Sequence, residues 1–157
     1  MSDVKIDKVS YARVMKAIDT LRKNITDMRP VWKEYSKFYP TQIIAKGYKT
    51  QGGIFGAKWA KYSDSYRKWK MKHYSGMPKL VLNGDMKKAS IDGIKSKITK
   101  DNLKMTIDNR LASLHQFGGK KMPARPFAMN IDGSMPNSAL TWLMLQMRKH
   151  AMKGQNK

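Results

Sequence analysis

The chain has 157 residues, 41% of them hydrophobic, and its 32 Lys and Arg residues against 11 Asp and Glu residues give a formal net charge of +21. This length and apolar content predict one domain with a modest core and exclude a disordered tail. The absence of Cys excludes disulfides, Cys-ligated zinc and thiol nucleophiles. The positive charge favours polyanionic partners, chiefly nucleic acid, and its predominance of Lys favours phosphate contacts over base reading.

The first residues do not have the pattern of a targeting or membrane segment. Residues 1–8 are polar and include Asp3 and Asp7, which is not typical of a signal peptide. The longest apolar run, residues 139–145, is far shorter than the roughly 20 residues that a membrane span needs. We therefore expect a soluble protein made in a cytoplasm, with no membrane partner.

The N-terminal segment predicts a helical arm. Thr26 or Asp27 is placed to cap a second helix with Pro30 in its first turn, and Pro40 should end or kink that helix. Apolar residues recur every three or four positions, as expected for an amphipathic helix. The first stripe consists of Tyr11, Met15, Ile18, Leu21, Ile25 and Met28, and the second of Val31, Tyr35 and Phe38. Residues 1–46 are expected to form this arm.

The middle of the chain predicts a loop and a short aromatic helix. Residues 47–56 contain several glycines, which indicates a flexible connection, and they lack the Walker spacing of a phosphate-binding loop. Ser63 is expected to cap a helix over residues 64–73. Aromatic residues in and before this helix alternate with basic ones, which permits base stacking, although packing of a helix face in the core explains their spacing better. These aromatic residues are Trp59, Tyr62, Tyr66 and Trp69.

Residues 94–108 give the clearest strand pattern. Apolar and polar residues alternate on both sides of a turn at residues 100–102, which predicts a β-hairpin with one apolar and one basic face. The basic face contains Lys95, Lys97 and Lys104. The apolar face needs a helix or a strand to cover it.

The last third of the chain predicts a further extended segment and a C-terminal helix. The extended segment falls at residues 126–131, and Pro136 and Asn137 open a helix that runs to about Met152. Trp142 and Leu145 lie off its main apolar stripe, so a neighbouring subunit is expected to cover them.

These elements predict one organisation for the chain. The fold class is α+β: N-terminal helices, a small antiparallel sheet with a basic-faced hairpin, and a C-terminal helix packed on the sheet. The chain is a single domain, 1–157, divided into the arm (1–46), an α+β core (57–152) and a basic tail (153–157).

The sequence lacks the side-chain patterns that catalysis needs. The acidic residues are dispersed, with Glu34 the only Glu, and no two of them have the spacing of a glycosidase or two-metal pair. His73, His115 and His150 are far apart and have no metal-ligand spacing. A triad assembled from distant residues stays open, but we expect no enzyme activity, no cofactor and no metal.

One stretch resembles a known family. Residues 114–119 read Leu-His-Gln-Phe-Gly-Gly, and residues 123–127 read Pro-Ala-Arg-Pro-Phe. This segment resembles the Mu-like phage virion morphogenesis, or tail-completion, family, and weaker matches upstream extend the resemblance over about residues 59–127. The motif residues are His115, Gln116, Phe117, Gly118, Gly119, Ala124, Arg125, Pro126 and Phe127. The chain departs from the family at Asn83-Gly84, where Thr-Gly is usual.

The resemblance implies a structural subunit of a tailed bacteriophage virion that acts in tail completion or head–tail joining at the neck. It implies a homo-oligomeric ring, a hexamer, around the channel through which DNA passes, with other neck and tail proteins as partners. The chain would then be made in the host cytoplasm and end at the head–tail junction of the virion.

Within that ring, we expect Lys95, Lys97 and Lys104 to line the channel and make transient, non-specific contact with genomic DNA, although an ordinary solvated sheet face explains them equally well. His115 is expected to make structural hydrogen bonds within the motif. Two other functions stay open: a free, non-catalytic nucleic-acid-binding protein, and a tail hydrolase, for which no acidic or His cluster is seen.

Overall fold

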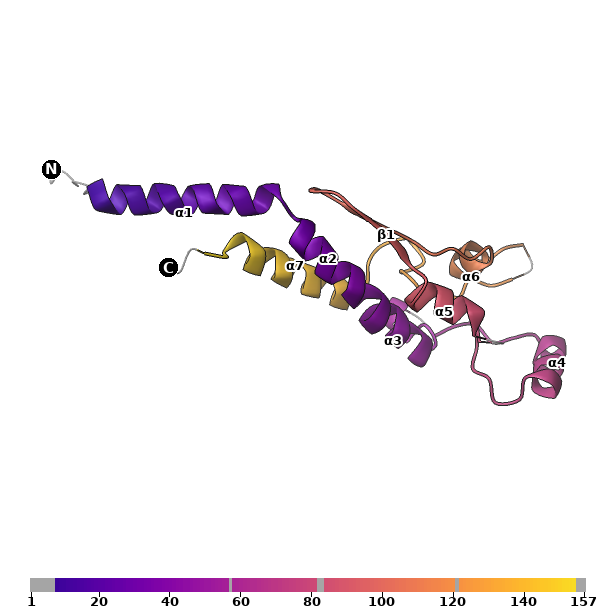
Figure 1. The fold of residues 1–157 in the computed structure, drawn as a ribbon. Helices are drawn as coiled ribbons and strands as arrows, with labels where there is room; N and C mark the ends of the chain where they lie inside the picture. The colour runs from indigo at the N-terminus through magenta and orange to yellow at the C-terminus, as the bar shows by residue number, and fades with distance from the viewer. Residues whose placement is uncertain (1–7, 57, 82–83, 121, 155–157) are drawn as a thin grey trace.

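The computed structural model describes residues 8–56, 58–81, 84–120 and 122–154 (Figure 1). Parts of the segments named above lie outside these ranges: residues 1–7 of the arm, residues 57, 82, 83 and 121 of the core, and residues 155–157 of the tail. The described part combines helices with one two-stranded antiparallel sheet, so the α+β class is confirmed. The elements are α1 (Lys8–Thr26), α2 (Arg29–Phe38), η1 (Tyr39–Ile44), α3 (Ala45–Lys49), η2 (Gly53–Phe55), α4 (Asp64–His73), α5 (Asp85–Ile91), β1 (Lys95–Ile98), β2 (Leu103–Thr106), α6 (Ala112–Phe117) and α7 (Asn137–Ala151).

The bend in the N-terminal arm lies between α1 and α2. Asp27 accepts a hydrogen bond from the backbone N–H of Arg29 at 3.1 Å and forms an ion pair with the Arg29 guanidinium. The hydrogen bonds and charge of Arg29 lower the pKa of Asp27 to about 2. The carboxylate therefore satisfies a free N–H at the start of α2, and Pro30 follows in the first turn as expected.

The helix that starts at α2 does not end at Pro40. It passes through the π-helical segment η1 into α3 and reaches Lys49, so of the two outcomes expected at this proline, an end or a kink, the helix end is wrong. In η1 the N–H of Ala45 donates to the carbonyl of Pro40, five residues back. The wider π turn is a local adjustment at the proline, and burial of the helix face on both sides keeps the segment helical.

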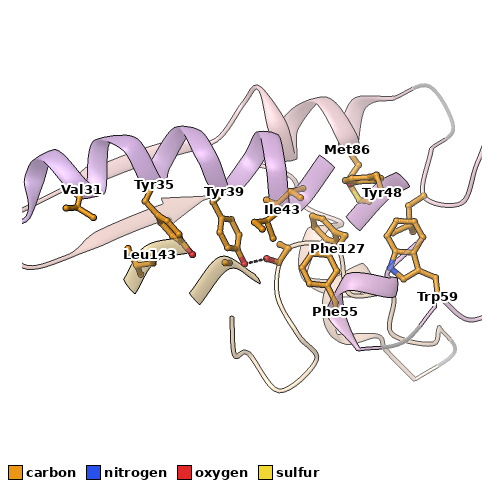
Figure 2. Packing of buried hydrophobic residues seen from close by; sticks show 14 residues of the cluster. Val31, Tyr35, Tyr39, Ile43, Tyr48, Phe55, Trp59, Met86, Phe127 and Leu143 are labelled. Atoms are coloured by element: carbon orange, nitrogen blue, oxygen red, sulfur yellow. Dashed lines mark hydrogen bonds between the residues drawn. The ribbon is translucent and has the colours of Figure 1, made fainter. Parts of the chain in front are cut away.

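This long helix supplies much of the hydrophobic core. Figure 2 shows Val31, Tyr35, Tyr39, Ile43 and Tyr48 along one face of it, pointing toward residues from distant parts of the chain. The Tyr39 hydroxyl donates to the carbonyl of Ala128 at 2.6 Å. The other buried hydrophobic residues of the core come from later segments of the chain; they are Phe55, Trp59, Leu80, Met86, Phe127, Ala128, Ala139 and Leu143.

The segment expected to be a flexible connection is instead folded against this core. Gly47 lies inside α3, and a Cβ atom there would come 2.3 Å from the buried ring of Phe55. Phe55 itself belongs to the short 3₁₀ helix η2. A glycine at position 47 therefore allows the two segments to pack closely, which sequence composition alone does not distinguish from flexibility.

The predicted hairpin forms, with one apolar and one basic face. β1 and β2 pair antiparallel, with Ser96 opposite Met105 and Ile98 opposite Leu103. The apolar side packs on α2, and the backbone N–H of Met28 donates to the carbonyl of Lys100 in the turn. The expected contact of the C-terminal helix with the sheet is therefore corrected: α7 packs mainly on α1, α2 and η1. One helix is enough to cover two short strands, and α2 occupies that face.

The extended segment expected at residues 126–131 does not form a strand. The backbone N–H groups of Phe127 and Ala128 donate to the side-chain oxygen of Gln116 instead of to a neighbouring strand. Because these N–H groups are satisfied by a side chain, the segment runs irregularly through the core.

Candidate functional site

The basic face of the hairpin consists of Lys95, Lys97, Lys104 and Thr106, and all four side chains are exposed. Lys95 forms an ion pair with Asp108 at 2.7 Å, which raises the pKa of Lys95 and lowers the pKa of Asp108. Lys97 and Lys104 are direct cross-strand partners. Two like charges opposite each other destabilise a sheet, so this pair is better accommodated when an anion lies between them.

The motif segment is organised around the amide of Gln116, which lies on α6 and is buried. Its Nε2 atom donates to the carbonyl of Met129 at 2.8 Å and of Asn130 at 3.3 Å. Its Oε1 atom accepts from Phe127 at 3.2 Å and from Ala128 at 3.1 Å. One side chain thus joins α6 to the segment that carries the buried ring of Phe127.

Arg125 joins the same segment to residues 59–62. Its guanidinium donates to the carbonyls of Ala60 and Lys61, each at 3.3 Å, and lies over the Tyr62 ring, 4.9 Å from the ring centroid. Trp59 donates from its indole N–H to the carbonyl of Pro126, the residue after Arg125. The motif therefore closes the core by pairing two segments that are more than 60 residues apart.

Gly118 turns the chain at the end of α6. Its φ is +80°, and a Cβ atom there would lie 2.8 Å from the nitrogen of Ala124 and 2.9 Å from the carbonyl oxygen of Met122. Gly119 and Met122 form a short antiparallel bridge directly after it. Position 118 therefore needs glycine for two reasons: other residues rarely adopt this positive φ, and a side chain would collide with the backbone. Phe117, beside it, is exposed.

The structural hydrogen bond expected of His115 is not made by its Nδ1 atom. Its Nδ1 atom is buried and has no hydrogen-bond partner in the described part of the chain. Burial, with the nearby charge of Arg125, lowers the pKa of His115. The side-chain hydrogen bonds of the motif come from Gln116 and Arg125, and His115 lines a pocket.

That pocket has a volume of about 680 Å³ and lies between the motif, the start of α4 and the start of α5. Lys61, Arg110 and Arg125 contribute positive charge to its lining, and Asp85 contributes the one acidic side chain among the lining residues. Tyr66 of α4 also lines it. No local sequence pattern indicates this pocket, because its residues come from four separate segments.

The aromatic residues around α4 are only partly buried. Trp59 is in the core, whereas Tyr66 is 36% exposed and Trp69 is 43% exposed. The prediction that all four aromatic side chains form a buried face is therefore wrong for these two. Ser63 caps α4 as predicted, accepting from the backbone N–H of Tyr66 at 3.4 Å.

The two residues expected at a subunit interface differ in their surroundings. The Trp142 ring stacks on Phe38, with centroids 4.1 Å apart and planes 6° apart, so its apolar surface is partly covered within the chain. Leu145 is 47% exposed. Further large apolar side chains are exposed on α1 and α7; these are Tyr11, Val14, Met15, Ile18 and Ile25 on α1, and Leu140 and Met144 on α7. We call these residues, with Leu145, the α1–α7 apolar surface.

Within the described ranges, no group of three or more His, Cys, Asp or Glu residues could hold a metal ion, and no helix is long and apolar enough to cross a membrane. Among the positively charged regions of the described residues are the hairpin face and the pocket. Comparison of the chain with family models, curated proteins and solved structures finds no match.

Proposed function

We propose that this chain is a non-catalytic structural subunit of a tailed-phage virion, acting in tail completion or head–tail joining. In this proposal several copies form a ring at the neck, and DNA passes through the ring. The resemblance of residues 114–127 to the tail-completion family supports this class of protein. The physical features of the chain support the two properties that a ring subunit needs.

The first property is an apolar surface for neighbouring subunits. The α1–α7 apolar surface is exposed in the single chain. An isolated amphipathic helix is only marginally stable in water, and among the larger packing contacts in the described residues α1 is held by α7 alone. A neighbouring copy that covers this surface would stabilise α1.

The second property is a polar surface that tolerates DNA without holding it. The exposed pair Lys97 and Lys104 on the hairpin face is the observation that carries the DNA-channel part of the proposal. Lysines bind phosphates as mobile point charges and carry little sequence information. Such a face attracts a passing duplex and releases it easily.

The ring is tested with the purified full chain by native mass spectrometry and negative-stain electron microscopy. The proposal predicts closed rings with a central hole, with six copies as the expected number. Replacing Leu145 by Asp should reduce the ring population while leaving the circular dichroism spectrum unchanged. A wild-type chain that stays monomeric over a wide range of concentration and salt would contradict the ring.

The alternative function is a free, non-catalytic nucleic-acid-binding protein, which the exposed aromatic residues of α4 favour. The two functions differ in sequence preference. A subunit that lets DNA pass should bind all duplexes alike, whereas a regulator should prefer one sequence with roughly nanomolar affinity at physiological salt.

A further inference from the structure

Three exposed aromatic rings lie together at α4, at the end of the molecule far from both termini (Figure 1). The ring centroid of Trp69 is 5.4 Å from that of Tyr66 and 5.6 Å from that of Tyr74. We call Tyr66, Trp69 and Tyr74 the α4 aromatic surface. Solvent-exposed rings in contact with one another offer flat apolar area that this chain leaves uncovered.

The same helix is strongly basic. Arg67, Lys68 and Lys72 are exposed, and the acidic residue of the helix, Asp64, pairs with Arg67 at 3.1 Å. Lys70 points the other way: its Nζ atom donates to the carbonyl of Pro78 and lies 5.2 Å from the Tyr62 ring centroid. The lysine that faces inward anchors α4, and those beside the rings remain available to an anionic partner.

The 680 Å³ pocket adjoins the α4 aromatic surface, because Tyr66 belongs to both. Arg125 in its wall is only 4% exposed, and its guanidinium donates to two backbone carbonyls, which are neutral acceptors. A buried guanidinium that is held by neutral groups keeps its positive charge at the pocket wall. Lys61 and Arg110 add to this charge, and these three cations outnumber the carboxylate of Asp85 in the lining, so the pocket favours an anionic group such as a phosphate.

We propose that the α4 aromatic surface and this pocket form a binding site for single-stranded nucleic acid. Bases stack on Trp69, Tyr66 and Tyr74, and a backbone phosphate enters the pocket toward Arg125, Lys61 and Arg110. Stacked rings combined with cations are the pattern that sequence-tolerant single-strand sites use. A duplex keeps its base faces paired and stacked, so its bases cannot reach these rings.

This site is separate from the hairpin face proposed for passing DNA, so the two are tested separately. The probe is a fluorescently labelled oligo-dT of about 15 nucleotides, compared by anisotropy with a duplex of equal length at roughly 0.15 M salt, using the full chain. The wild-type chain should bind oligo-dT more tightly than the duplex. Equal affinities would overturn the inference.

Variants of the aromatic surface identify the site. Trp69→Ala and Tyr66→Ala should each lower oligo-dT affinity about tenfold, with little change for the duplex, and Trp69→Phe should retain most of the binding. Met71→Ala is the matched control, because Met71 is an exposed apolar residue of the same helix without a ring. If Trp69→Ala and Tyr66→Ala bind oligo-dT as the wild type does, the inference is wrong.

Two further controls distinguish base stacking at α4 from attraction by charge alone. Polyglutamate carries charge without bases, so it should compete weakly, and competition as strong as that of unlabelled oligo-dT would overturn base stacking. The double variant Lys97→Gln with Lys104→Gln should lower the affinity for oligo-dT and for the duplex by similar factors. If the chain forms rings but does not prefer oligo-dT to the duplex, only the α4 site is refuted. If it prefers oligo-dT but forms no rings, only the ring is refuted.

Discussion

Gln116 connects more of the fold than any other side chain of the motif. It is buried and donates to two carbonyls and accepts from two N–H groups of the segment that follows Pro126. In the described residues no strand pairs with those backbone groups, so the Gln116 amide makes the hydrogen bonds that a neighbouring strand would otherwise make. Loss of the amide would leave buried polar groups unsatisfied, which costs more than a hydrogen bond is worth.

Replacing Gln116 by Ala should lower the free energy of unfolding by about 2–3 kcal/mol, because two buried N–H groups lose their acceptor. Urea denaturation followed by circular dichroism measures the change. Gln42→Ala is the control, since Gln42 is exposed on η1, and it should change stability by less than about 0.5 kcal/mol. Equal effects of the two substitutions would contradict the role assigned to Gln116.

Gly118 and Gly133 provide a matched pair for the second residue-scale prediction. Both have positive φ, +80° and +82°, but a Cβ atom meets backbone within 3 Å at Gly118 and nothing within 4 Å at Gly133. Gly133→Ala should cost about 1 kcal/mol from conformation alone, and Gly118→Ala should cost clearly more. Thermal unfolding of both variants measures the difference. Similar melting temperatures would refute the extra cost assigned to the collision of a Cβ atom with the backbone at position 118.

The sequence located the motif but not the role of each side chain in it. Residues 114–127 carried the resemblance to a known family, and the expected hydrogen-bonding residue was His115. The structure gives that role to Gln116 and leaves Nδ1 of His115 without a partner in the described part of the chain. Which of two adjacent polar side chains faces the core depends on the direction of α6, which no local pattern encodes.

At the scale of elements, period-two alternation was sufficient to predict the hairpin and its two faces, because a sheet has only two sides. The continuation of the helix past Pro40 was not predictable in the same way. A proline usually breaks a helix, but here the buried face from Val31 to Tyr48 continues past it and a π turn absorbs the misfit. Tertiary burial therefore outweighs the local rule.

The prediction from the aromatic spacing around α4 was wrong for a related reason. Residues spaced three or four apart on a helix share one face, but the spacing does not say what covers that face. Trp59 lies before the helix and enters the core, whereas Tyr66 and Trp69 lie on α4 and stay exposed. The cavity beside them could not be predicted from the sequence, because its lining residues are far apart along the chain.

The hairpin face gives a prediction about salt dependence. Lys97→Gln together with Lys104→Gln should make the plot of log affinity for duplex DNA against log salt concentration shallower by about two, since each lysine releases about one counterion. Lys33→Gln with Lys37→Gln removes the same charge from α2 and should change the slope less. Equal slopes for both double variants would mean that the charge acts only as a diffuse field.

Substitutions at Trp142 and Leu145 distinguish a residue that stabilises the fold from one that is available for assembly. Trp142→Ala should lower the free energy of unfolding by about 3 kcal/mol, because it removes the stack on Phe38 that joins α7 to α2. Leu145→Ala should cost less than about 0.5 kcal/mol, as an exposed surface position does. Urea unfolding measures both, and a large loss for Leu145→Ala would place that residue in the core instead of at an interface.

At the scale of the whole molecule, a net charge of +21 opposes the association of identical chains through their mutual repulsion. The α1–α7 apolar surface acts in the opposite direction. A ring of these subunits is therefore expected to need either moderate salt or bound polyanion to form. In the proposed ring the same charge would draw DNA to the assembled subunits, so assembly and DNA contact are expected to reinforce each other.

The most direct test is negative-stain electron microscopy of a lysate from phage that lack this chain. A subunit of the neck should leave DNA-filled heads separate from unattached tails, or tails of uncontrolled length, and the wild-type chain supplied in trans should restore joined virions. Intact, joined virions in normal number would contradict the structural role and assign the positive charge to nucleic-acid binding outside the virion.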